Sequence, residues 1–287
     1  MKIRKIHNAA PEDVLMVNRL TDTCNRVDNT CYPYGDGSDF RNDGDINLFI
    51  AEKDDEAVGY LRIFAPITSE GELTILVLPD SRRKGICQGL LKMGLRELQR
   101  RSIPEYLLVC DARGDSGRSA AQALGAVYDF SEYLLRFNDE FTTKTRPVDS
   151  SPVYLMPADR SQSDQLQKIM IEAFGNQEND AKDHLETYFR DDRRHLYTIW
   201  YADRPAGVIG VYDETSAYIH GFAVAKDLRG RGIGRSALKA VVEMIQREHP
   251  GRTIELEVQT ENIHALGLYE SDGFVRMTEF RYFRGKV

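Results

Sequence analysis

The chain has 287 residues, which is more than one domain usually contains and allows two domains with separate cores. Charged residues make up 29%, mean hydropathy is -0.45, and no apolar run approaches the roughly 18 residues that a membrane span needs. The formal net charge of -7 argues against nucleic acid, because phosphate backbones are bound by basic surfaces. We therefore expect a globular protein with no membrane or nucleic-acid partner.

The N-terminal sequence MKIRKIHNAAPEDVL has no continuous apolar segment and no lipidation motif, so we expect a cytoplasmic protein. The four cysteines, Cys24, Cys31, Cys87 and Cys110, all lie in the first half. Their spacing does not match a zinc site and no histidine cluster accompanies them. We predict free thiols and no bound metal.

The first half begins with an amphipathic helix predicted over residues 11–27, where Glu12 and Asp13 suit the positive end of the helix dipole. Residues 31–45 are rich in Gly, Asp and Asn and predict an exposed acidic loop, although its carboxylates could also attract a cationic substrate. The next segments predict a hairpin over 47–66 that turns at 54–56, a third strand over 71–79 and a helix over 80–101. A strand over 105–112 follows, and residues 116–137 predict a helix and a last strand.

Residues 141–152 are polar, aperiodic and proline-containing, which predicts a linker between domains at 1–140 and 153–287. The second half repeats the order of elements, over 158–174, 180–191, 194–214, 216–225, 232–247, 253–260, 264–274 and 275–285. Segment 77–82 aligns with 224–229 without a gap. We infer an internal duplication.

A glycine-spaced basic loop, Arg229 to Gly234, follows a predicted strand and opens a predicted helix. Glycines let the backbone approach an anion, and the N–H groups and dipole at the start of a helix favour negative charge. Arg229, Arg231 and Arg235 add positive charge at the rim. This pattern predicts a pyrophosphate site.

Other loops with glycines fit less well. The spacing Gly-x-Gly-x-Gly differs from the Gly-x-Gly-x-x-Gly of dinucleotide-binding folds, and the Gly-Lys-Ser/Thr of a P-loop is absent. A tight turn with solvated arginines is the structural alternative that the loop alone leaves open.

The second half resembles the GNAT superfamily of acyl-CoA-dependent N-acetyltransferases. Its Gln/Arg-x-x-Gly-x-Gly/Ala signature and its Asn…Ala…Leu-Tyr…Gly-Phe segment match, in order, Arg229, Gly232, Gly234, Asn262, Ala265, Tyr269, Gly273 and Phe274. The whole chain resembles a tandem GNAT protein, an arrangement similar to that of mycothiol synthase. The resemblance implies an α/β fold with a mixed α+β sheet in two tandem acyl-CoA N-acyltransferase domains.

The resemblance also implies a cleft between two splayed strands that holds acetyl-CoA. Main-chain groups of the strand would hold the pantetheine, the loop would hold the pyrophosphate, and an N–H near Val224 could stabilise an oxyanion. The implied cofactor-binding residues are Phe222, Ala223, Val224, Arg229, Gly230, Arg231, Gly232, Ile233, Gly234, Arg235 and Asn262. Asn262 has the alternative role of a helix cap.

Tyr269 and His220 are the predicted catalytic residues. On the family pattern Tyr269 protonates the leaving sulfur, whereas the alternative is a buried, hydrogen-bonded aromatic residue. His220 stands where many relatives have a glutamate, and an imidazole with an ordinary pKa near 6.5 suits a base at neutral pH. A histidine that only hydrogen-bonds within the strand is the alternative, with Glu255, Glu257 and Glu214 as other candidate bases.

The first half carries a weaker copy of the loop. A second acyl-CoA site would use Leu76, Val77, Arg82, Arg83, Lys84, Gly85, Ile86 and Cys87. Cys87 replaces the last small residue of the signature, Ala121 or Gln122 stands where the second half has Tyr269, and Asp115 or Gly114 lies near the position of Asn262. We therefore expect the first half to be catalytically weak or inactive.

The predicted function is transfer of an acetyl group from acetyl-CoA to a primary amine of a small molecule, by a monomer or homodimer. A non-enzymatic acyl-CoA sensor is the alternative, since it needs the loops but neither Tyr269 nor His220. Mycothiol synthase-like acetylation is a narrower enzymatic alternative. The acceptor is expected to contact residues 31–45 and 174–195, where the sequence does not identify it.

Overall fold

The computed structural model describes residues 2–35, 45–54, 56–142, 153–175, 178–213 and 215–287. The chain forms two compact units, which we call the first unit (Met1–Tyr133 with Met277–Val287) and the second unit (Leu134–Arg276). Both contain a mixed sheet with helices on its two faces, which confirms the predicted α/β class.

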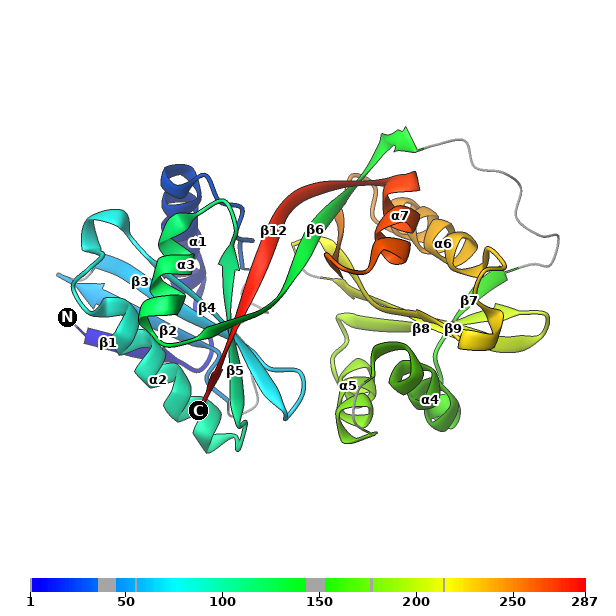
Figure 1. Cartoon of the computed structure of the whole chain (residues 1–287), viewed down its shortest axis with the longest axis horizontal. Helices are drawn as coiled ribbons and strands as arrows, with labels where there is room; N and C mark the ends of the chain where they lie inside the picture. The colour runs from blue at the N-terminus through cyan, green and yellow to red at the C-terminus, as the bar shows by residue number, and fades with distance from the viewer. Residues whose placement is uncertain (1, 36–44, 55, 143–152, 176–177, 214) are drawn as a thin grey trace. The chain divides into compact units, whose positions relative to one another are not determined.

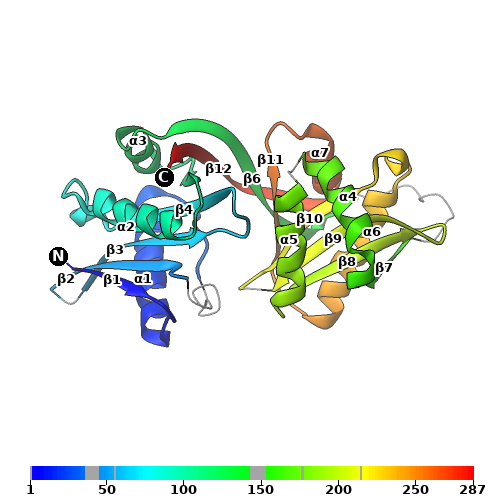
Figure 2. The same ribbon diagram turned by 90° about the horizontal axis from the view of Figure 1, so that it is seen from below.

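The first unit has the sheet order β1-β2-β3-β4-β5-β12-β6. Its helix α1 lies on one face of this sheet, and α2 and α3 lie on the other (Figure 2). The elements that begin in this unit are β1 (Lys2–Ile6), α1 (Pro11–Asp28), β2 (Leu48–Lys53), β3 (Glu56–Phe64), β4 (Glu70–Val77), a 3₁₀ turn (Pro79–Ser81), α2 (Ile86–Arg100), β5 (Glu105–Asp111), α3 (Asp115–Ala123) and β6 (Val127–Thr142).

The second unit has the order β12-β6-β11-β10-β9-β8-β7, with α4 and α5 on one face and α6 and α7 on the other (Figure 1). Its elements are β7 (Val153–Pro157), a 3₁₀ turn (Arg160–Gln162), α4 (Ser163–Phe174), α5 (Glu178–Arg190), β8 (Arg194–Tyr201), β9 (Arg204–Asp213), β10 (Ala217–Val224), a 3₁₀ turn (Lys226–Leu228), α6 (Ile233–Glu248), β11 (Ile254–Gln259), α7 (Ile263–Ser271) and β12 (Asp272–Lys286).

Each unit contains an edge strand that the sequence analysis missed. β1 pairs antiparallel with β2, and β7 pairs antiparallel with β8. β1 reads KIRKI and lacks the apolar run by which the inner strands were predicted. β7 reads VYLMP, which is apolar, but it has only five residues and stands directly between the predicted linker and the predicted helix that starts at residue 158.

Two long strands pass from one unit to the other. The compact division falls within β6, between Tyr133 and Leu134, and within β12, between Arg276 and Met277. Residues 280–286 of β12 pair antiparallel with β5 in the first unit. The end of the predicted domain 153–287 therefore lies in the first unit, and the predicted linker lies almost wholly in 143–152, outside the described residues.

Apolar periodicity explains how the helices pack. Leu90 and Leu98 of α2 are fully buried against Leu61 and Leu73 of the sheet. In the second unit, α6 buries Ile233, Ala237, Leu238, Val241, Val242 and Ile245. Since each buried aliphatic side chain contributes about 1.5–3 kcal/mol, this packing holds the start of each helix against the sheet.

Candidate active site

Strand β10 contains a bulge at the position predicted for the acyl-CoA cleft. Its antiparallel register with β9 shifts between His220 and Ala223, and Gly221 has φ = 58°. Glycine adopts this left-handed conformation without the steric cost that a side chain brings. β10 pairs in parallel with β11 only from Ala217 to Ile219, so the two strands separate beyond that point.

The backbone of Val224 faces the gap between β10 and β11. The N–H of Ala225 donates to Ala206 of the β9 side at 2.8 Å. Because main-chain groups of successive strand residues point to opposite sides, the N–H and C=O of Val224 point away from β9. The carbonyl accepts a hydrogen bond from Nε of Arg229 at 2.9 Å, which leaves the N–H directed at the gap.

The predicted pyrophosphate loop has the expected backbone. Gly230 and Gly232 have φ of 77° and 78°, and Gly232 caps α6. The first helical bond runs from Ser236 to Gly232 at 3.1 Å. Since the first amides of a helix have no partner within it, the N–H groups of 233–235 point out of the helix end.

The three predicted rim arginines have different surroundings. Arg229 is tied to the carbonyl of Val224, and Arg235 donates to Ser271 at 2.9 Å and lies 3.5 Å from the carboxylate of Asp272. Arg231 is exposed. Arg231 is therefore the rim arginine best placed to meet a solvent-borne anion.

Tyr269 lies near the end of β10. Its ring centroid is 6.4 Å from that of Phe222 and 5.9 Å from that of Phe274. A Cβ atom added to Gly234 would lie 3.6–3.7 Å from Phe222, Val224 and Leu268, so β10, α6 and α7 meet here. Burial raises the pKa of Tyr269 above its ordinary value of 10.0, which keeps the phenol protonated.

Asn262 caps α7. Its Oδ1 accepts a hydrogen bond from the N–H of Ala265 at 3.1 Å, and the residue stands at the N-cap position. This is the capping alternative of the sequence analysis. The structure thus gives Asn262 a local role, and cofactor binding through its amide group stays a prediction.

His220 belongs to an aromatic stack that sequence reasoning missed. Nδ1 lies 3.1 Å from the hydroxyl of Tyr188, and the two rings stack with centroids 5.1 Å apart. His184, one turn earlier on α5, stacks on Tyr188 at 5.4 Å and lies 6.0 Å from His220. His184 and Tyr188 are four residues apart, and this spacing in the sequence indicates that their side chains share one helix face. Both residues fall in the predicted acceptor segment 174–195.

Both histidines of this stack are neutral at physiological pH. Burial, with the nearby charges of His184 and Arg194, holds the pKa of His220 well below 6.5. Burial and Arg194 lower the pKa of His184 to about 4. The Nε2 atom of each ring is buried without a hydrogen-bond partner in the described part of the chain. Each ring is therefore an uncharged group with one buried nitrogen that has no hydrogen-bond partner among the described residues.

These pKa values predict a loss of stability in acid. The unfolded chain binds protons on both histidines below about pH 6.5, whereas folded His184 stays neutral down to about pH 4. Stability is therefore complete above pH 6.5 and falls as pH drops, by at most about 1.4 kcal/mol per pH unit for each residue. Urea unfolding of the wild type and of His184→Gln between pH 7 and pH 5 measures this. The variant should show a shallower dependence, and equal slopes would contradict the assignment.

The other candidate bases lie on the same sheet face as His220 or outside the described residues. Glu255 is opposite Tyr218 in the parallel register, and its carboxylate binds Arg136 at 2.8 Å. Glu257, two residues further along β11, shares the face of Glu255. Glu214 lies outside the described residues. Glu255 is thus engaged in an ion pair, and the role of all three glutamates as alternative bases stays a prediction.

The first unit repeats the loop without the bulge. β4 pairs with β3 in unbroken register from Glu72 to Val77, and with β5 only as far as Leu73. Gly85 caps α2 with φ = 78°, like Gly232, and Arg83 takes the left-handed position that Gly230 has in the second unit. The two loops therefore share a conformation although Arg83 and Cys87 replace two of the three glycines.

The helix that carries Tyr269 has a counterpart in the first unit that lacks a tyrosine at the equivalent position. Helices α3 and α7 both have nine residues and are followed, two positions on, by Gly125 and Gly273 with φ of 80° and 94°. This register places buried Ala121 at the position of Tyr269. Gly114, the N-cap of α3, takes the position of Asn262.

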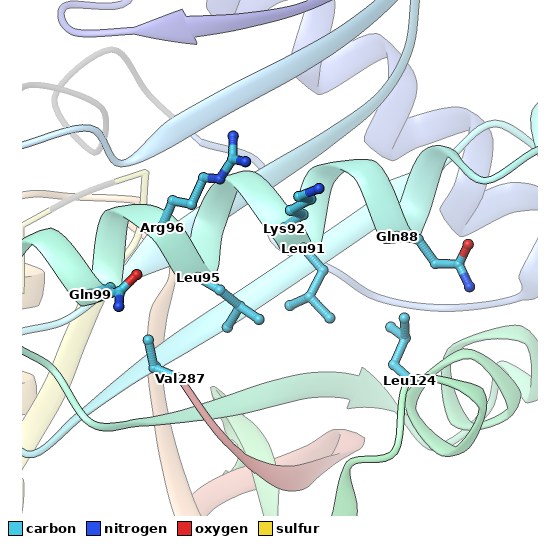
Figure 3. Close-up of a pocket in the computed structure, with 8 residues that line it drawn as sticks. All are labelled: Gln88, Leu91, Lys92, Leu95, Arg96, Gln99, Leu124 and Val287. Atoms are coloured by element: carbon cyan, nitrogen blue, oxygen red, sulfur yellow. The ribbon is translucent and has the colours of Figure 1, made fainter.

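A surface pocket of about 300 Å³ lies elsewhere on the first unit (Figure 3). Leucines of α2 form its floor together with Leu124 and Val287, and no predicted site residue lines it. Within the described ranges there is no group of three or more His, Cys, Asp or Glu side chains that could hold a metal ion. In the same residues, the helices are too short or too polar to cross a membrane.

Both units thus combine a pair of splayed parallel strands with a glycine-capped helix start. The model of the Acetyltransferase (GNAT) family matches the chain twice, at residues 15–125 and 163–274. The chain belongs to this family, whose members are acyltransferases, and carries its domain in tandem.

Two curated relatives match short stretches. N-alpha-acetyltransferase 30 of Saccharomyces cerevisiae is 43% identical over 67 residues, which are 23% of this chain and 38% of the relative. A probable spermine N(1)-acetyltransferase of Bacillus subtilis subsp. natto is 31% identical over 72 residues, 24% of this chain and 47% of the relative. The chain thus spans less than half the length of these relatives.

Two solved structures resemble the whole chain. A GCN5-related N-acetyltransferase from Sphaerobacter thermophilus has a TM-score of 0.72 at 17% identity, covering 99% of this chain and 95% of that one. A tandem GNAT protein from the clavulanic acid biosynthesis pathway has a TM-score of 0.71 at 16% identity, covering 99% and 98%. These likenesses show the tandem fold.

Proposed function

We propose that this protein is a cytoplasmic enzyme that transfers an acetyl group from acetyl-CoA to a primary amine of a small molecule, and that the second unit performs the chemistry. One observation carries the proposal: a helix start suited to phosphate, a strand N–H facing an open gap, and a protonated Tyr269 converge around Gly234. The first unit lacks the hydroxyl at the equivalent position, Ala121. The two curated relatives are named for acetylation of amines.

The residues support a stepwise acyl transfer. The amine nitrogen bonds to the thioester carbon, and the developing oxyanion accepts a hydrogen bond from the N–H of Val224. The C–S bond then breaks, and Tyr269 donates its proton to the thiolate. Burial raises the pKa of Tyr269, so the transfer requires that the thiolate leave into the same buried surroundings, which raise the pKa of its thiol as well. The phenolate regains a proton from solvent, and the base that accepts the amine proton releases it to solvent.

We propose that Nε2 of His220 accepts the proton that the amine loses. A low pKa makes the imidazole a weak base, but it also keeps the ring neutral and able to accept. Attack turns the amine nitrogen into a cationic, acidic centre, so a weak base suffices at that stage. Tyr188 acts as a positioning residue, because its hydroxyl engages Nδ1 and leaves Nε2 as the available nitrogen.

Tyr188→Phe tests this positioning role. The variant keeps the ring stack and removes only the hydroxyl, so we expect kcat to fall about fivefold to tenfold, as loss of one hydrogen bond predicts, with KM for acetyl-CoA unchanged. Tyr60→Phe is the matched control, since it removes a buried hydroxyl that bonds Thr21 in the first unit. Equal kcat losses in both variants, or a rise only in KM for acetyl-CoA, would contradict the assignment.

A thiol-release assay tests the function itself. Acetyl-CoA is offered with diamines, amino sugars, short peptides with free N-termini and the precursor of mycothiol, and free CoA is measured over time. We expect release that depends on one class of amine. Binding of acetyl-CoA with no release on any amine would support the sensor alternative, and release with the mycothiol precursor alone would support the narrower enzymatic one.

A further inference from the structure

The segment that follows α1 in the first unit is held in a defined path. Asn29 ends the helix with φ = 54°, and the Asn25 side chain then bonds both main-chain groups of Tyr32, each at 2.9 Å. Two turns earlier on α1, the Asn18 side chain bonds both main-chain groups of Gly35, at 2.8 and 3.0 Å. Two asparagines seven residues apart thus fix this segment along α1.

The same segment reaches the end of β5. The N–H of Cys31 donates to Oδ2 of Asp111 at 2.7 Å, and the N–H of Asp111 donates to the buried hydroxyl of Tyr32 at 2.9 Å. A Cβ atom added to Gly117 of α3 would lie 3.4 Å from that hydroxyl. Beyond Leu108, where the parallel pairing of β4 with β5 stops, the β5 side of the gap is therefore covered by Cys31 and Tyr32.

Asp28 covers the other side of the gap between β4 and β5, next to the glycine loop. Its carboxylate accepts from both terminal nitrogens of Arg82, at 2.9 and 2.5 Å, and from Oγ of Ser116 at 3.1 Å. A Cβ atom added to Gly114 would meet Thr30 at 2.7 Å. Arg82 begins the glycine loop and Ser116 lies in the first turn of α3, so one carboxylate joins the two elements between which a pantetheine would pass.

The equivalent residues of the second unit are engaged locally. Arg229 bonds the carbonyl of Val224 as its counterpart Arg82 bonds that of Val77, so the added contact of Arg82 is its ion pair with Asp28. Asn262, the counterpart of Gly114, caps its own helix. After α4 ends at Phe174, the described chain resumes in α5, which packs against α4 and β8.

Charge acts in the same direction as shape. Asp28 neutralises Arg82 and places a carboxylate at the rim of the loop, where it repels a pyrophosphate. Arg231 of the second loop and its counterpart Lys84 are both exposed, so the two loops differ here in the Asp28–Arg82 pair and not in that cation. We infer that the cleft of the first unit is filled by the chain's own Asp28–Tyr32 segment, and that the protein therefore binds one acyl-CoA, in the second unit. This inference rests on the proposed function of the second unit.

Isothermal titration of the full chain with acetyl-CoA tests whether only the second unit binds the ligand. The wild type is compared with two charge-reversal variants at equivalent exposed loop positions, Arg231→Glu and Lys84→Glu. We expect one site per chain, at least about tenfold weaker binding in Arg231→Glu, and unchanged binding in Lys84→Glu. Two sites, or equal weakening in both variants, would overturn the inference while the proposed function stands. No binding at all would overturn both.

Hydrogen exchange locates the site independently of stoichiometry. Saturating acetyl-CoA should protect amides in 222–235 and leave 28–35 and 76–87 at their unliganded rates. Protection of 76–87 together with faster exchange in 28–35 would show that the ligand displaces the segment, which would overturn the inference.

Discussion

The kcat of the Tyr269→Phe variant is expected to fall about 100-fold, within the range attributed to one general acid. Phenylalanine retains the ring that contacts Phe222 and Phe274, so the packing of α7 on β10 is preserved. Binding of acetyl-CoA should change little, because the lost proton is needed only when the C–S bond breaks. Steady-state kinetics and calorimetric titration of the same preparation separate the two effects.

The pH dependence sharpens this prediction. Burial raises the pKa of Tyr269 above 10.0, so the proton donor of the wild type stays protonated through neutral and moderately alkaline pH. Wild-type kcat should therefore show no alkaline loss from this residue below pH 10, and the ratio of wild-type to variant kcat should be constant from pH 7 to pH 9. A variant with unchanged kcat would assign the proton donor elsewhere.

Gly207→Ala should destabilise the protein by about 2–3 kcal/mol, the cost of overpacking a site that cannot relax easily. A Cβ atom at this position would overlap the carbonyl oxygen of Ala223 and lie 3.1 Å from Cα of Val224. Both neighbours are backbone atoms, so β9 and β10 must separate. Because the main chain of 222–224 is proposed to hold the pantetheine, we also expect about tenfold weaker acetyl-CoA binding.

Gly59 provides the matched control. It pairs with Val77 on β4 as Gly207 pairs with Val224 on β10. An added Cβ would lie 3.0 Å from the carbonyl oxygen of Leu76, a milder contact, so Gly59→Ala should cost about 1 kcal/mol and leave acetyl-CoA binding unchanged. Urea unfolding and titration with acetyl-CoA measure both variants. Weaker ligand binding in Gly59→Ala would show that acyl-CoA binding depends on the first unit as well.

Local sequence patterns predicted most of the fold. The helices of both units, the hairpin turns and the glycine that caps each central helix follow from periodicity and from backbone conformations that few residues other than glycine adopt. The absence of a tyrosine at the position of Tyr269 in the first half was also visible, because α3 and α7 have the same length and end alike. Edge strand β1 was missed because it carries little apolar sequence, and β7 because its short apolar run stands directly after the predicted linker.

The sequence by itself determined the family, the duplication and the residues offered to the loops, because these depend on near neighbours in the chain. Only the tertiary structure decided what surrounds His220, since the stack unites α5 with β10 across 32 residues. It alone revealed that Asp28 meets Arg82, 54 residues away, and that Cys31 meets Asp111, 80 residues away. Such contacts are selected by the packing of whole elements, which a local pattern does not encode. In the described part of the chain, β10 pairs with β11 only as far as Ile219, whereas in the first unit Asp111 of β5 bonds the chain's own Cys31 and Tyr32.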